Sequence, residues 1–198
     1  YACVRLGWGR SNEDAKDLTQ EFFLFLLEGD ALRQADPSRG RFRTYLKAVL
    51  RNFLGMEHRK ATRVKRGGGL KMVSIDVDAA DRDLSATRAG DPEHVFDREW
   101  ARALVAESLT EVAASLTAAG REAHWRLLEA HDLSTETEPP SYAALGTRFN
   151  LTEHQVKAIL QETRRRIRDS VILKIKEYAL DEQEVWEELE YLMGLWKG

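Results

Sequence analysis

Apolar residues recur three and four positions apart along most of the chain, which is the spacing of the buried face of an α-helix. The first such series covers residues 15–26 and follows Ser11, whose side chain can cap a helix. Gly29 then supplies a helix stop. A second series runs from about Arg41 into the low sixties. The apolar residues expected to be buried are Ala15, Leu18, Phe22, Phe25, Leu26, Phe42, Leu46, Val49, Leu50 and Phe53.

The second half of the chain shows the same helical spacing. Pro92 suits the first turn of a long helix, and residues 141–149 predict a short helix before a tight turn. Thr152 can cap the next helix, and residues 181–196 predict a final acidic one. Because no long stretch alternates apolar and polar residues as a strand does, we predict an all-α protein.

Three glycines at residues 67–69, and the acidic, poorly periodic segment after them, separate the two sets of helices. We therefore expect two small helical domains joined by a flexible acidic linker, and 198 residues are enough for both. The predicted divisions are residues 1–66 for the first domain, 67–90 for the linker, 91–180 for the second domain and 181–198 for a C-terminal acidic helical extension.

Composition and motifs exclude several classes of function. A single cysteine, Cys3, leaves no disulfide framework, and no two histidines stand at metal-ligand spacing. No apolar run approaches the roughly 20 residues that span a bilayer. Neither a P-loop nor a nucleophile elbow occurs. We expect a cytoplasmic protein that is not an enzyme and uses no metal, no cofactor and no membrane contact.

Local charge points to a nucleic-acid partner, although the net charge of the chain is only −3. Within residues 39–66 ten basic residues stand against one acid, Glu57, and aromatic residues lie between them. Such a stretch suits single-stranded or partly melted DNA, because bases stack on rings and phosphates meet cations. We expect Phe42 and Phe53 to lie in the core and Tyr45 to be exposed. The preceding helix is acidic, so this domain can bridge a protein partner and a nucleic acid.

Residues 141–168 carry the sharpest pattern, a short helix, a tight turn and a second helix. A helix-turn-helix has this order of elements, and its second helix lies in the major groove of DNA. An ordinary amphipathic helix with a solvated basic face gives the same pattern, so that alternative stays open. The expected buried seam is Val156, Leu160, Thr163, Ile167, Val171 and Tyr178, and the expected outward stripe is His154, Lys157, Gln161, Arg164 and Arg168.

Two parts of the chain, about residues 1–66 and 92–178, resemble in this order region two and region four of the extracytoplasmic-function sigma factors of bacterial RNA polymerase. Asp17-Leu18-Thr19-Gln20-Glu21 is similar to the family's core-binding helix. Residues 41–53 are similar to the part of region two that opens and reads the minus-ten element. Residues 141–168 resemble region four, which reads the minus-thirty-five element and docks on the flap of the second-largest polymerase subunit.

The resemblance implies three sets of site residues, the first of which docks on the clamp helices of the largest polymerase subunit. The sets are Asp17, Leu18, Gln20 and Glu21 for the polymerase core; Arg43, Tyr45, Lys47, Arg51, Asn52, Arg59, Lys60 and Arg63 for minus-ten DNA; and Thr152, His154, Gln155, Lys157, Gln161, Arg164, Arg165 and Arg168 for minus-thirty-five DNA.

The resemblance implies a sigma factor that directs polymerase core to promoter DNA and assists promoter opening. Two alternatives stay open: a stand-alone helix-turn-helix regulator, and an adaptor that binds no DNA. The extension at residues 181–198 either packs on the chain's own helices or docks an anti-sigma factor or another regulator. Its acids Glu184, Glu187, Glu188 and Glu190 are expected to point outward.

Overall fold

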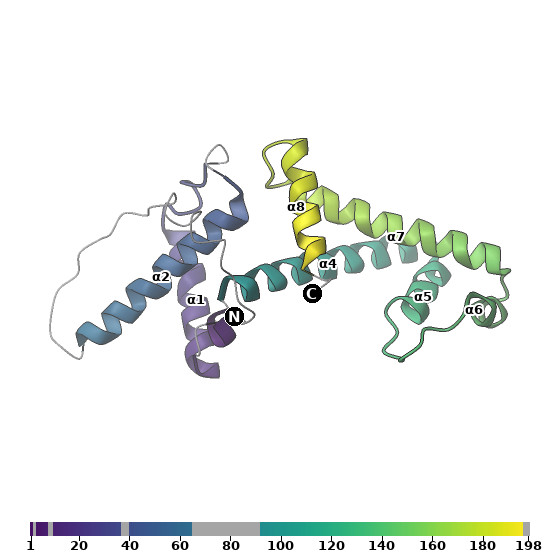
Figure 1. The fold of residues 1–198 in the computed structure, drawn as a ribbon, viewed down its shortest axis with the longest axis horizontal. Helices are drawn as coiled ribbons and strands as arrows, with labels where there is room; N and C mark the ends of the chain where they lie inside the picture. Colours follow the sequence, from purple (N-terminus) through teal and green to yellow (C-terminus); the bar gives the residue numbers. More distant parts are fainter. Residues whose placement is uncertain (2, 8–9, 37–39, 65–91, 196–198) are drawn as a thin grey trace. The chain divides into compact units, whose positions relative to one another are not determined.

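The computed structural model describes residues 1, 3–7, 10–36, 40–64 and 92–195, and every regular element among them is helical (Figure 1). This confirms the predicted all-α class. No helix in these ranges combines the length and the apolar character that crossing a bilayer requires. The elements are a short π-helical segment η1 (Cys3–Gly7) and the helices α1 (Asn12–Glu28), α2 (Phe42–Val64), α4 (Pro92–Ala118), α5 (Glu122–His131), α6 (Tyr142–Phe149), α7 (Glu153–Lys176) and α8 (Glu182–Gly194).

The chain divides into two compact units. The first combines Tyr1–Ala101 with Tyr178–Gly198, and the second is Arg102–Glu177. These divisions differ from the predicted boundaries at residues 91 and 180. The reason is that the start of α4 and the whole of α8 pack with the N-terminal helices. The predicted linker, residues 67–90, lies outside the described residues.

The core of the first unit contains the facing sides of α1 and α2. Ser11 caps α1 by accepting a hydrogen bond of 3.1 Å from the backbone N–H of Asp14, and the helix ends before Gly29, as predicted. Phe22 and Phe53 are buried with their ring centroids 5.4 Å apart, which confirms their place in the core. The packing of these rings sets α2 against α1.

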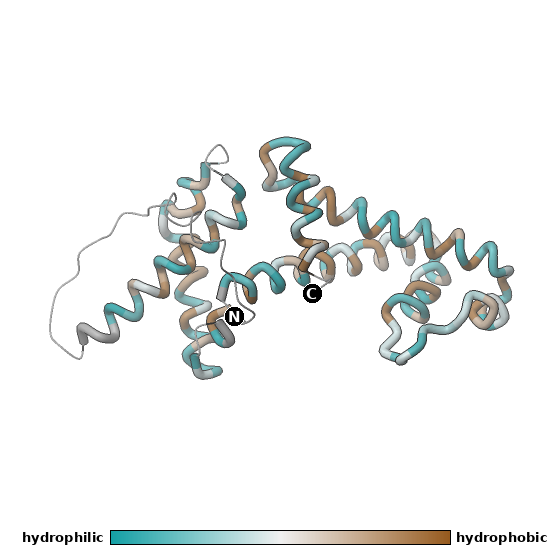
Figure 2. Tube along the Cα trace, viewed as in Figure 1, coloured by the Kyte–Doolittle hydropathy of each residue, from teal (hydrophilic) through white to brown (hydrophobic). Residues whose placement is uncertain are grey.

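A three-helix group of α5, α6 and α7 forms the core of the second unit. A short turn joins α6 to α7, and Asn150 in that turn adopts the left-handed conformation (φ 54°, ψ 50°). Thr152 caps α7, as predicted, and forms a capping box with Gln155. Val156 and Leu160 are fully buried, as expected for the seam, and Figure 2 shows apolar and polar positions alternating along α7. The predicted helix, turn and second helix are therefore present.

Gly146 allows the turn to pass close to α6. A Cβ atom at this position would lie 2.6 Å from the carbonyl oxygen of Leu151, which is closer than van der Waals contact allows. The backbone N–H of Leu151 also donates a hydrogen bond of 2.8 Å to the carbonyl oxygen of Gly146. The geometry of the turn therefore requires glycine, although alanine is the better helix former.

An ion pair ties α5 to α7. Arg164 donates two hydrogen bonds of 2.7 Å to the carboxylate of Asp132, the residue that follows α5. These hydrogen bonds, with a further one from His131, hold the pKa of Asp132 below its usual range. The ring of His131 lies 5.1 Å from that of Tyr142 in α6, measured between centroids. Side chains from all three helices thus meet at one place.

We predict that Gly146→Ala lowers the free energy of unfolding by about 1–3 kcal/mol, because the added methyl group forces the turn away from α6. Gly55→Ala is the matched control, since its Cβ would meet only the end of the Arg59 side chain, at 3.6 Å. We expect the control to be neutral or to gain up to about 1 kcal/mol from helix propensity. Urea unfolding followed by circular dichroism measures both. If both substitutions changed the free energy of unfolding equally, the close approach of the Leu151 carbonyl to Gly146 would not be the cause.

We predict that Asp132→Asn lowers the free energy of unfolding at neutral pH by on the order of 1 kcal/mol, since the pair is partly exposed. The folded-state pKa of Asp132 is depressed, so its contribution is present above the ordinary value of 3.8 and is lost as the pH falls through the folded value. The difference between variant and wild type should therefore narrow below about pH 4. Asp169→Asn is the control, because its pair with Arg165 is long, at 3.7 Å, and exposed. A pH-independent difference for Asp132→Asn would contradict the assignment.

Candidate nucleic-acid interface

The outward face of α7 carries the residues predicted to read minus-thirty-five DNA. The core of the unit binds the opposite side of the helix through Val156 and Leu160, so the polar stripe is turned to solvent. The structure thus places these side chains where a nucleic acid can reach them, and the DNA contact itself stays a prediction. The exposed residues are Thr152, His154, Gln155, Lys157, Gln161, Arg164, Arg165 and Arg168.

Some of these side chains already have partners within the chain. The hydroxyl of Thr152 accepts a hydrogen bond of 3.2 Å from the backbone N–H of Gln155, whose side-chain oxygen accepts one of 2.8 Å from the backbone N–H of Thr152. Arg164 is held by Asp132, so in this structure it joins α7 to α5 instead of reaching outward. Within the described part of the chain, no side-chain hydrogen bond or ion pair engages His154, Lys157, Gln161 or Arg168.

The predicted core-binding residues lie on α1. Asp17, Gln20 and Glu21 are exposed, while Leu18 is half-buried and packs against the core of the first unit. Leu18 therefore serves the fold, and the three polar residues are available to a partner.

Two exposed leucines of α1 extend this surface and were missed by the sequence analysis. Leu24 and Leu27 have exposed fractions of 53% and 75%. They follow Gln20 by four and seven positions, so the three side chains share one side of the helix. The signal was present in the sequence, because residues 22–27 are all apolar whereas one buried face needs only about half of them.

Tyr45 is buried, with an exposed fraction of 8%, so its predicted exposure is wrong. Its hydroxyl donates a hydrogen bond of 2.5 Å to the carbonyl oxygen of Ala31, and burial raises the pKa of that hydroxyl. The ring belongs to the core between α2 and the segment after α1. In this position it cannot stack on a DNA base.

Arg43 and Lys47, also predicted as minus-ten contacts, are buried with exposed fractions of 2% and 6%. The cause is that α2 is covered on a second side, away from α1, by residues of α4 and α8. In this conformation neither cation can reach DNA.

The remaining predicted minus-ten residues are closer to solvent. Arg51 is partly exposed and forms an ion pair with Glu93 at the start of α4. Asn52 is half-buried, and Arg59 and Lys60 are exposed near the end of α2. The side chain of Arg63 lies outside the described residues. The accessible part of the predicted surface is therefore the second half of α2.

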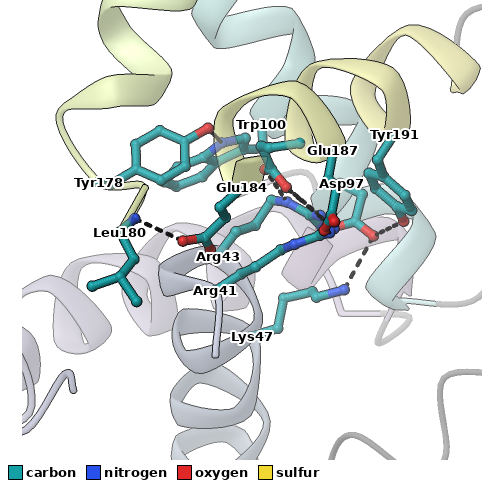
Figure 3. A network of polar contacts seen from close by, with 11 residues as sticks. Arg41, Arg43, Lys47, Asp97, Trp100, Tyr178, Leu180, Glu184, Glu187 and Tyr191 are labelled. Atoms are coloured by element: carbon teal, nitrogen blue, oxygen red, sulfur yellow. Dashed lines mark hydrogen bonds and ion pairs between the residues drawn. The ribbon is translucent and has the colours of Figure 1, made fainter. Parts of the chain in front are cut away.

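A buried polar network joins α2, α4 and α8 (Figure 3). Arg43 donates hydrogen bonds of 2.7 and 3.1 Å to the carboxylate of Glu188 and a further one to Asp97. Lys47 donates to Asp97 at 3.1 Å, and the hydroxyl of Tyr191 donates to the same carboxylate at 2.6 Å. Two cations thus meet two carboxylates, so the charges of the network balance, as buried charges require.

The network also shifts the proton affinities of its members. Although burial acts to lower the pKa of Arg43, the hydrogen bond to Glu188 and the charges of Asp97 and Glu188 raise it above its usual value. Burial lowers the pKa of Lys47 against the opposing effect of Asp97. Burial, with a contribution from Asp97, raises the pKa of Tyr191 to about 12. Tyr191 therefore remains a hydrogen-bond donor throughout the neutral range.

The C-terminal extension packs on the chain's own helices, which was one of its two interpretations. Its helix α8 begins after Asp181, which caps it, and its apolar face is buried through Val185 and Leu192. The prediction that Glu188 points outward is wrong, because its exposed fraction is 1%. Helical spacing was the available signal: Glu188 stands three positions after Val185 and four before Leu192.

Aromatic side chains flank the network. Phe42 of α2 is half-buried beside Trp100 of α4, with 6.4 Å between ring centroids. Tyr178 lies against both rings and accepts a hydrogen bond of 3.3 Å from the indole N–H of Trp100. Tyr178 was predicted in the seam of the second domain, but it belongs to the first unit. These rings join the segment before α8 to α2 and α4.

A family model described as sigma-70 region 2 matches residues 2–64, the segment that contains η1, α1 and α2. Searches of curated proteins and of solved structures give no significant match. The match supports roles in promoter recognition and in binding RNA polymerase. Over residues 2–64, this match supports a sigma factor of the sigma-70 family.

Proposed function

We propose that the chain is a sigma factor of the extracytoplasmic-function type, which brings RNA polymerase core to a specific class of promoters and helps to open them. The observation that carries the proposal is the presence of two candidate surfaces in the expected order. A region 2 match covers η1, α1 and α2, and an exposed polar stripe lies on α7 behind a short turn. The role is non-enzymatic, and it places the chain in the cytoplasm, where bacterial polymerase acts.

Polymerase core binds the outer side of α1 in this proposal. Gln20 supplies hydrogen-bonding groups, and the exposed Leu24 and Leu27 beside it supply apolar area that water otherwise covers. Asp17 and Glu21 border the leucines with negative charge. A helix face with an apolar centre and a polar border suits docking against helices of a protein partner.

The second half of α2 contacts the minus-ten region. Arg59 and Lys60 are exposed cations for phosphates, and Asn52 is the candidate for a base edge. Arg63 extends this basic run by sequence. Arg43, Lys47 and Tyr45 are left out of this contact in the conformation described, because they are buried.

Residues 91–180 supply region four, with α7 as the recognition helix. His154, Lys157 and Gln161 lie in its first half, where a helix-turn-helix contacts base edges. Arg165 and Arg168 lie further along and suit the phosphate backbone. The close turn at Gly146 and the Arg164–Asp132 ion pair hold α7 against α5 and α6.

We predict that Gln20→Ala weakens binding to purified core polymerase at least fivefold and leaves the DNA preference of the assembled complex unchanged. Gln161→Ala should leave binding to core unchanged, since its side chain lies on α7. It should lose about 1–3 kcal/mol of discrimination between base pairs at one position of the DNA site. Both glutamines are exposed and helical, so each variant is the matched control for the other. Titration of labelled core and binding-site selection from a DNA library measure the two effects.

The same pair of measurements separates the proposal from a stand-alone regulator. If the free chain selects a duplex site tightly without core, and Gln20→Ala has no effect, then the chain is a helix-turn-helix regulator. If the complex with core selected no specific DNA site from the library, the assignment of α7 as a recognition helix would be wrong.

We predict that Tyr45→Phe lowers the free energy of unfolding by about 0.5–1.5 kcal/mol through loss of the hydrogen bond to Ala31, and leaves promoter opening unchanged. Permanganate footprinting of the opened promoter and urea unfolding check the two parts. Asn52→Ala is the comparison. Asn52 is half-buried in the part of α2 proposed to contact minus-ten DNA, so promoter opening should fall while stability changes little. If Tyr45→Phe lost promoter opening while keeping wild-type stability, the tyrosine hydroxyl would have a role in DNA contact and the interpretation of Tyr45 as a core residue would be wrong.

A further inference from the structure

Helix α8 places carboxylates beside the N-terminal end of α2. Glu187 accepts a hydrogen bond of 2.7 Å from Arg41, and Glu188 lies 3.8 Å from the same guanidinium. Glu188 also takes both hydrogen bonds that Arg43 donates on that side, at 2.7 and 3.1 Å. All four residues belong to the first unit. Two arginines at the start of the basic helix are thus bound by acids from the C-terminal end of the chain (Figure 3).

The covered arginines belong to the basic stretch assigned to DNA. Arg43, Lys47 and Arg51 follow one another at intervals of four, so they form one stripe on α2. Each of them is paired with a carboxylate: Arg43 with Glu188, and Lys47 and Arg51 with acids of α4. The accessible cations of α2 begin only after this stripe, at Arg59.

The chemistry of the contact is that of a phosphate site. An arginine presents a planar fork of donors that fits a carboxylate and a phosphate alike, so a nucleic-acid backbone can replace Glu188 at Arg43. Removing α8 without a replacement would leave a buried cation short of partners, which is strongly unfavourable. An exchange of carboxylate for phosphate avoids that cost, because Arg43 keeps an anion throughout.

We propose that α8 is an intramolecular cover, which withholds Arg41 and Arg43 from nucleic-acid phosphates until single-stranded DNA displaces Glu187 and Glu188. This inference rests on the proposed function, since it assigns a further phosphate site to the same basic helix. The apolar face of α8, Val185, Leu189 and Leu192, holds the cover in place when DNA is absent.

The test compares two variants of the full chain that carry the same chemical change on the same helix. Glu188→Gln weakens the contact with Arg43, whereas Glu190→Gln alters an exposed acid on the outer side of α8. Fluorescence anisotropy with a labelled single-stranded DNA of about 20 nucleotides and mixed sequence gives the affinity at several salt concentrations. Both variants lose one negative charge, so a general electrostatic effect appears equally in each.

Glu188→Gln should bind this DNA at least fivefold more tightly than wild type, and Glu190→Gln should stay within twofold of wild type. Equal affinities of the two variants, including no binding by either, would overturn the proposal.

Hydrogen exchange of the wild-type chain keeps the proposal testable if Glu188→Gln does not fold. Saturating single-stranded DNA should increase exchange at the amides of residues 185–192 at least fivefold. Unchanged protection of α8 at saturation would show that the cover stays closed, and would overturn the proposal. Binding of purified core by the same wild-type sample reports on the proposed function separately, since that contact uses α1.

Discussion

The arrangement of the first unit depends on the buried guanidinium of Arg43. A cation with 2% of its surface exposed must keep its counter-ions, because leaving a buried charge unpaired costs about 3–5 kcal/mol. Its two carboxylates come from Asp97 and Glu188, which are 54 and 145 positions away in the sequence. One side chain of α2 therefore fixes where the start of α4 and the whole of α8 lie. This constraint explains why the C-terminal extension belongs to the N-terminal unit.

The same constraint divides α2 into two functional parts. Its first half packs on α1 with one side and meets the carboxylates of α4 and α8 with another, so Arg43 and Lys47 are paired within the chain in this conformation. Its second half carries the exposed Arg59 and Lys60. In the second unit, α7 likewise carries some polar side chains that are paired within the chain and others that are free to meet a partner. Arg164 binds Asp132 and holds the helices together, whereas Lys157 and Gln161 point to solvent.

Helical periodicity predicted much of this fold, because the buried face of each helix is determined by residues close together in the sequence. The seam of α1, the capping box at Thr152 and the short turn after α6 depend on residues close together in sequence. The burial of Tyr45 and Arg43 was missed because a period of 3.6 identifies one buried face and gives no sign of a second. A basic stripe has the same pattern whether it faces solvent or distant acids. Only the contacts with Asp97 and Glu188 distinguish the two cases.

The chain thus combines a segment that matches sigma-70 region 2, a second helical unit with an exposed polar helix, and a C-terminal helix that covers part of the basic stretch of α2. The most direct test of the promoter-directing role is transcription by purified polymerase core from a library of promoter fragments, with and without this chain. We predict that the chain enriches transcripts from fragments sharing one minus-ten and one minus-thirty-five element at a fixed spacing, and that core alone does not. Transcripts that are the same with and without the chain would contradict a sigma-factor role.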